Sequence, residues 1–114
     1  MALQYNLSKV YEISENDKEF ALQILSLFLQ EVPVEIKIIK EAIEDKQYDK
    51  SYAAAHKIKP TLDLLGMDLA YEDNLLIMNW SKEAGKRKEI KDVYKSLKEK
   101  IDAAVLEIKK DFKL

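Results

Sequence analysis

Residues 52–66 read YAAAHKIKPTLDLLG, and their spacing predicts one amphipathic helix. At about 100° per residue, the side chains divide between two opposite faces. One face carries the small and aliphatic positions Ala54, Ala55, Ile58, Thr61, Leu62 and Leu65. The other carries Tyr52, His56, Lys59 and Asp63, with Pro60 beside them. We therefore expect a helix held in a core by one face, with the only histidine of the chain directed to solvent.

Upstream of this helix, the sequence predicts two shorter ones. Asn16 is the expected N-cap of the first, with Glu19 three residues later completing a capping box. Apolar residues at helical spacing continue from there to Val32. Pro33 suits the first turn of a new helix, so a second helix is expected from residue 33 to about residue 45. Residues before Asn16 carry no clear periodic pattern.

Downstream, two further helices are expected. Gly66 is a good C-terminal cap for the helix over residues 48–65. Asp68 is the expected N-cap of a helix that reaches about residue 84. The last helix has the most regular pattern, because its apolar residues recur in steps of four and three, as in a helix packed in a bundle. Those residues are Ile90, Tyr94, Leu97, Ile101, Ala104 and Ile108.

Composition supports an all-helical fold. The 114 residues suit one domain over residues 1–114, and only two glycines and two prolines are present. A strand-rich fold needs many more turn residues than this. Long helices with short links become antiparallel neighbours. The predicted fold is therefore all-α: an up-and-down antiparallel four-helix bundle with an additional N-terminal helix, residues 17–32, packed against it.

Several classes of protein are disfavoured by the composition. No cysteine is present, so disulfides and thiolate chemistry are excluded. No stretch approaches the roughly 20 apolar residues that span a bilayer, and residues 1–10 do not resemble a signal peptide. Residues 81–114 hold 11 Lys/Arg against 7 Asp/Glu, but interleaved acids argue against nucleic-acid binding. We expect a cytoplasmic protein that contacts neither membrane nor nucleic acid.

Two neighbours, Lys59 and Pro60, single out His56. Lys59 lies one turn along on the same face, where a cation can meet an anion bound to the imidazole. Pro60 has no amide hydrogen, so the His56 carbonyl loses its helical partner and a kink is expected. A proline in mid-helix, four residues after the only histidine, breaks a local rule in the way that functional sites do.

The segment 55–60, AHKIKP, followed by Leu65-Gly66, resembles the signature of histidine-containing phosphotransfer (HPt) domains. Their pattern is Ala-His-x-Leu-Lys-Gly, with Leu-Gly several residues later. Ile58 replaces leucine, a conservative change, whereas Pro60 replaces a glycine that leaves room for the partner. Residues 11–14, Phe20 and residues 27–29 also resemble the helix that precedes the bundle in that family.

The resemblance implies a phosphorelay intermediate rather than an enzyme. His56 would accept a phosphoryl group from a receiver aspartate and pass it to another receiver, and Lys59 would hold the phosphoryl oxygens. Partners would be receiver domains or a hybrid sensor kinase, and the chain would be a monomer. It would carry no cofactor, because the divalent metal belongs to the receiver. Expected docking residues are Tyr52, Pro60, Asp63, Leu22 and Leu29. The last two lie at one margin of the wide apolar arc of the first predicted helix, and packing against the second helix or the N-terminal segment is an equal alternative for them.

Two alternatives remain open. A helical adaptor would use the same surface to bind a partner without phosphoryl chemistry. A dimerisation domain of a sensor kinase is less favoured, since an acidic residue usually follows the histidine there and Lys57 follows it here. No glycine-rich phosphate loop is present, so ATP binding is not expected. Asp63 is expected to be a solvated partner of Lys59.

Overall fold

The computed structural model describes residues 4–114, and every regular element within them is a helix. The five helices are α1 (Ser8–Ser14), α2 (Lys18–Glu44), α3 (Tyr48–Leu64), α4 (Asp68–Lys82) and α5 (Arg87–Phe112). The expectation of an all-helical protein is therefore confirmed. Residues 1–3, part of the segment judged not to be a signal peptide, lie outside the described residues.

The longest helix, α2, shows that the predicted break at Pro33 is wrong. Residues 18–44 form one helix of 27 residues with Pro33 inside it. A proline inside a helix is destabilising by about 3 kcal/mol, yet the buried face continues across it without a change of register. Buried side chains on both sides of Pro33 hold the helix together: Leu25, Phe28, Val32, Ile36, Ile39 and Ile43. Packing of this stripe outweighs the local signal.

The start of α2 also differs from the prediction. Asp17, not Asn16, is the N-cap, and its carboxylate accepts hydrogen bonds from the backbone N–H groups of Glu19 and Phe20. Asn16 instead has a positive φ of 68°, a left-handed conformation that asparagine tolerates better than most residues. It follows Glu15, the left-handed C-cap of α1, and residues 18–32 are part of α2 rather than a separate N-terminal helix.

The turn between α3 and α4 follows the prediction at Gly66 but not at Asp68. Gly66 has φ +64°, and the Met67 N–H donates to the Leu62 carbonyl at 3.0 Å, closing the end of α3 as expected for a glycine cap. Asp68 is the first residue of α4, and the cap position belongs to Met67, which makes no side-chain cap bond. A carboxylate in the first turn still suits the helix dipole.

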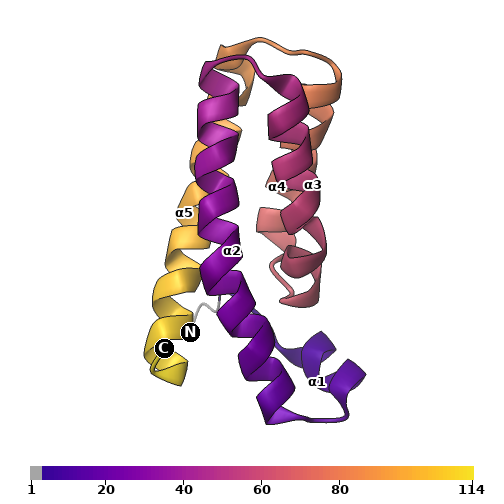
Figure 1. Cartoon of the computed structure of the whole chain (residues 1–114), viewed down its shortest axis with the longest axis vertical. Coiled ribbons are helices and arrows are strands. Elements are labelled where there is room, and N and C mark those ends of the chain that lie inside the picture. The colour runs from indigo at the N-terminus through magenta and orange to yellow at the C-terminus, as the bar shows by residue number, and fades with distance from the viewer. Residues whose placement is uncertain (1–3) are drawn as a thin grey trace.

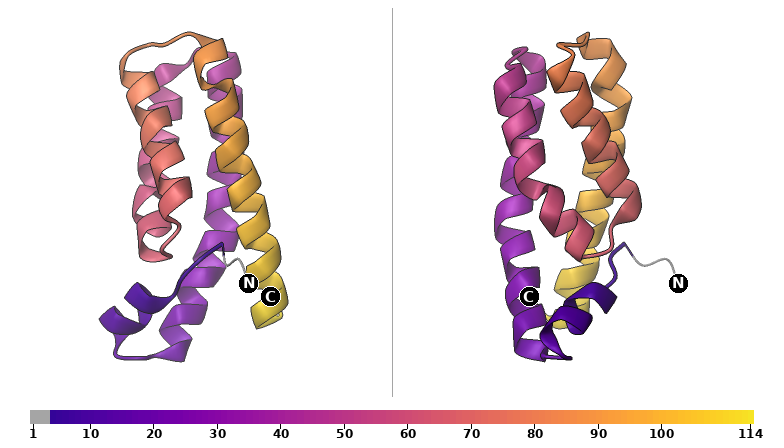
Figure 2. Two further views of the ribbon diagram at one scale, coloured as in Figure 1. Left: turned by 180° about the vertical axis from the view of Figure 1, so that it is seen from behind. Right: turned by 90° about the vertical axis from the view of Figure 1, so that its right-hand side faces the viewer.

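The four longer helices pack side by side around one core (Figures 1 and 2). Here α2 packs against α3 and α5, and α4 packs against the same two helices. Successive helices run in opposite directions, and α2 and α5 extend past the end of the shorter pair. The short α1 packs on α2 and lies beyond the turn that joins α3 to α4. The molecule is elongated, 43 × 23 × 21 Å.

The predicted seam of α5 is confirmed. Its regular apolar positions Ile90, Leu97, Ile101, Ala104 and Ile108 are buried, and Tyr94 is half-buried. On α3, Ala54, Ala55, Ile58 and Leu62 are buried as predicted, and so is Leu65 at its C-cap. Thr61, predicted on the same face, is only half-buried. Among the described residues, no helix combines the length and apolar character needed to cross a membrane.

Gly66→Ala tests the turn that ends α3. A methyl group at this position would lie 2.8 Å from Asn6 Cβ and would sit on a left-handed backbone. We expect the free energy of unfolding to fall by about 1–2 kcal/mol, measured by urea denaturation. Ala84→Gly serves as the control, because Ala84 has φ +50° and glycine relieves strain there. Equal stabilities for Gly66→Ala and wild type would contradict this role of Gly66.

Candidate functional site

The side chain of His56 is exposed in the middle of α3. It lines a hollow of about 270 Å³ together with Lys59, Pro60 and Asp63 of the same helix and Tyr71 of α4. Four of the predicted site residues are therefore brought together around one opening. Tyr71 was not predicted, because the sequence alone does not say how α4 is aligned against α3.

Tyr52 flanks the imidazole on the side away from Pro60. The two ring centroids are 6.0 Å apart with an interplanar angle of 26°, a separation at which aromatic rings attract each other. The ammonium of Lys82, from α4, lies 5.9 Å from the centre of the Tyr52 ring, within reach of a cation–π contact. These contacts limit the directions that the exposed imidazole can take.

Lys59 is half-buried and forms no ion pair with any residue in the range 4–114. The expected Lys59–Asp63 pair is wrong, because the Asp63 carboxylate is 2.8 Å from the ammonium of Lys9 in α1. That hydrogen bond raises the pKa of Lys9. Since the Asp63 carboxylate pairs with Lys9 of α1, the Lys59 ammonium can bind an anion at the hollow.

The neighbouring residue Lys57 points to the other side of α3. Its ammonium lies 3.1 Å from a carboxylate oxygen of Glu35 on α2, and this hydrogen bond raises the pKa of Lys57. The Glu35 side chain is only 10% exposed, so the pair ties α2 to α3 one residue from His56. Lys57 therefore joins α2 to α3, whereas Lys59 faces the hollow.

The two predicted docking residues on α2 are not part of this hollow. Because Glu35 pairs with Lys57, it lies at about the same height along the bundle as His56. Leu22 lies about 20 Å from Glu35 along α2, toward the N-terminus of that helix, at 1.5 Å per residue. Both Leu22 and Leu29 are turned by roughly 120–140° from Glu35 around the helix axis. Leu29 is partly buried against the core, whereas Leu22 is 39% exposed.

Two further apolar side chains of α2 are exposed to solvent. Leu27 and Ile38 are 47% and 37% exposed and fall within about 80° of Glu35 around the helix. Periodicity alone missed them as surface positions, because α2 is apolar over more of its circumference than one packed face requires. Leu27 lines a shallow hollow on α2 together with Leu22, Gln23, Ser26 and Gln30, and none of these residues lines the His56 hollow.

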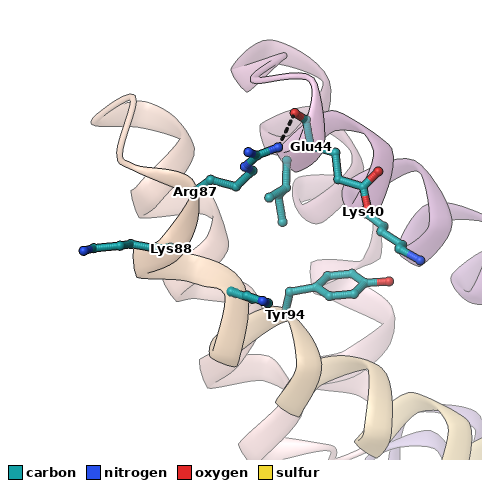
Figure 3. Close-up of a pocket in the computed structure, with 7 residues that line it drawn as sticks. Lys40, Glu44, Arg87, Lys88 and Tyr94 are labelled. Carbon is teal, nitrogen blue, oxygen red and sulfur yellow. Dashed lines mark hydrogen bonds between the residues drawn. The ribbon is translucent and has the colours of Figure 1, made fainter.

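A separate hollow of about 430 Å³ lies between the end of α2 and the start of α5 (Figure 3). Arg87 donates to the Glu44 carbonyl at 3.2 Å, so it caps the C-terminus of α2. The side chains of Lys40 and Lys88 extend toward opposite sides rather than converging. Burial raises the pKa of Tyr94, which lines the hollow. Capping and packing explain this arrangement, and it shares no residue with the His56 hollow.

No family model matches the chain, and no curated protein and no solved structure matches it either. The resemblance drawn above therefore depends on the residues around His56. Within residues 4–114, no three His, Asp or Glu side chains gather closely enough to hold a metal ion. What the site offers chemically is one solvent-facing imidazole, one unpaired ammonium and an opening between them that a visiting group can enter.

Proposed function

We propose that this chain is a phosphocarrier of the HPt type. His56 accepts a phosphoryl group from an aspartyl phosphate on a receiver domain and passes it to the aspartate of another receiver. The observation that carries the proposal is the exposed imidazole of the only histidine, placed beside the unpaired Lys59 ammonium on a helix anchored in the core. A phosphocarrier needs this combination, because its nucleophile must enter the pocket of another protein.

The fold proposed for this function is an up-and-down antiparallel four-helix bundle made of α2 to α5, with α1 as the additional N-terminal helix. Packing of α2 and α4 against both α3 and α5 supports it. In such a bundle the middle of α3 is rigid on its inner face and open to solvent on its outer face. The whole chain, residues 1–114, would act as a single domain.

The transfer step requires little from this chain beyond an aligned nucleophile. A neutral imidazole has a nitrogen lone pair available at neutral pH. That lone pair attacks phosphorus, an N–P bond forms, and the P–O bond to the receiver carboxylate breaks. The electron pair stays on the aspartate, and the proton on the other ring nitrogen is free to leave to water. Transfer to the second receiver reverses these events.

Charge stabilisation is divided between the two proteins. Phosphoryl transfer passes through a loose transition state, and catalysis consists mainly of positioning and of neutralising charge on the equatorial oxygens. Lys59 supplies one positive charge from this side of the interface. The divalent metal and the acidic pocket would come from the receiver, so this chain is proposed to be a substrate and carrier rather than an enzyme.

Docking is proposed to centre on the exposed side of α3. Tyr52, Pro60 and Asp63 surround His56 and would meet the receiver first. Pro60, like the glycine it replaces in the family pattern, has no long side chain that could block entry to the hollow. Leu22 and Leu29 would take part only if the partner also reached along α2. A monomer acting in the cytoplasm would present this surface without obstruction.

A helical adaptor without phosphoryl chemistry is the second candidate. It is favoured by exposed apolar side chains that do not line the His56 hollow, such as Val34 at 55%, Leu69 at 66% and Leu76 at 52%. Exposed apolar patches mark interaction surfaces when they are contiguous. The two candidates differ in one property, since only the phosphocarrier forms a bond to His56.

Incubation with a phosphorylated receiver tests the phosphocarrier proposal. We expect the wild-type chain to acquire a phosphate that is acid-labile and alkali-stable, as a phosphoramidate is. The His56→Gln variant should acquire none while it still binds the receiver, measured by calorimetry or a pull-down with purified receiver. Binding of the receiver by both proteins without any transfer would favour the adaptor.

Lys59→Ala tests the charge assigned to the hollow. We expect transfer to slow by roughly five- to fiftyfold, less than the hundredfold or more lost with an enclosed oxyanion donor, because solvent in the open hollow screens a half-buried ammonium. Single-turnover transfer kinetics give the rate. Lys50→Ala is the matched control, since Lys50 is an exposed lysine of the same helix that is not among the residues lining the hollow. Equal rates for the two variants would remove Lys59 from the mechanism.

A further inference from the structure

Asn74 of α4 is fully buried, with 0% of its surface exposed. Its side-chain nitrogen Nδ2 donates a hydrogen bond to the Ala55 carbonyl at 2.7 Å. Because a carbonyl only accepts, the nitrogen must be the atom that faces it. The other side-chain atom, Oδ1, is buried and has no hydrogen-bond partner among the described residues. A buried acceptor without a hydrogen-bond partner lowers the stability of the fold. A leucine of similar size at this position would therefore give a more stable core.

This hydrogen bond is made at the turn of α3 that carries the imidazole of His56. Ala55 immediately precedes His56, and Pro60 has no N–H to offer to the His56 carbonyl. The hydrogen-bond ladder of α3 is therefore incomplete at the turn that carries the imidazole. Figure 2 shows that the second half of α3 is inclined to its first half. A helix broken in this way needs an external tie if the imidazole is to keep one direction.

We infer that Asn74 is a positioning residue for His56: by holding the Ala55 carbonyl, it fixes the weakened turn of α3 against α4. Asn74 touches neither the imidazole nor an incoming phosphoryl group, so it acts through the backbone. Tyr71, three residues earlier on α4, lines the hollow. The same tie therefore sets the distance between the imidazole and the α4 wall of that hollow. The inference rests on the proposed phosphocarrier function.

A second buried polar contact in the α3–α4 interface provides a comparison. The hydroxyl oxygens of Ser51 and Ser81 lie 2.5 Å apart. Ser81 donates to the Ile77 carbonyl at 2.8 Å, and neither hydroxyl is left without a partner among the described residues. This pair is satisfied, and it lies more than a turn of α3 away from His56. Ser81→Ala is therefore the matched control for a change in the same interface.

The first measurement needs no receiver. We expect Asn74→Leu to keep the melting temperature or raise it, because the variant removes an orphaned acceptor. Nuclear magnetic resonance should at the same time show shifted His56 ring resonances and faster amide hydrogen exchange on both sides of Pro60. Ser81→Ala should leave these signals in place. His56 resonances and exchange rates unchanged in Asn74→Leu would overturn the positioning role, whatever the chain does with phosphate.

The second measurement uses a phosphorylated receiver over a range of concentrations. We expect Asn74→Leu to lower the limiting transfer rate by about tenfold or more, as a misplaced nucleophile does, with the half-saturating receiver concentration unchanged. Ser81→Ala should match wild type in both. A wild-type limiting rate in Asn74→Leu would overturn the inference. Failure of the wild-type chain itself to accept phosphate would overturn the proposed function instead, and the resonance data would still decide the role of Asn74 in holding His56.

Discussion

Burial of one face of α3 is the constraint on which the site depends. Ala55, Ile58 and Leu62 are each at most 2% exposed, and together they lock the rotation of the helix about its axis. With 3.6 residues per turn, a helix fixed in this way must turn the opposite face to water. His56 is on that opposite face, so its exposure follows from core packing. The same packing prevents α3 from rotating the imidazole toward the core.

Much of this arrangement was predictable because it depends on periodicity within single helices. The two faces of α3 follow from a 100° step, and the α5 seam from its spacing of four and three. The break expected at Pro33 was wrong for a tertiary reason. The local rule considers only the hydrogen bond that one proline loses. In the folded chain, burial of the apolar stripe from Leu25 to Ile43 stabilises the helix by more than that loss.

The details of the site were less predictable because they depend on how different helices are aligned. Lys9 pairs with Asp63 across a separation of 54 residues, which leaves Lys59 without an ion pair in the range 4–114. No local sequence pattern predicts this pairing. Tyr71 and Asn74 approach α3 only because α4 folds back from Gly66 at one particular level. These residues show that the face of a helix can be predicted from its sequence. The residues of other helices that contact this face can be identified only from the three-dimensional structure.

The most direct test of the phosphocarrier proposal observes the new bond itself. Because the chain has one histidine, protein labelled with ¹⁵N only in histidine reports on the His56 ring alone. After exposure to a phosphorylated receiver, we expect the phosphorus spectrum to show a resonance split by one-bond coupling to a ring nitrogen. Phosphorus found only on the receiver and as inorganic phosphate, with the ring nitrogens uncoupled, would contradict transfer through His56.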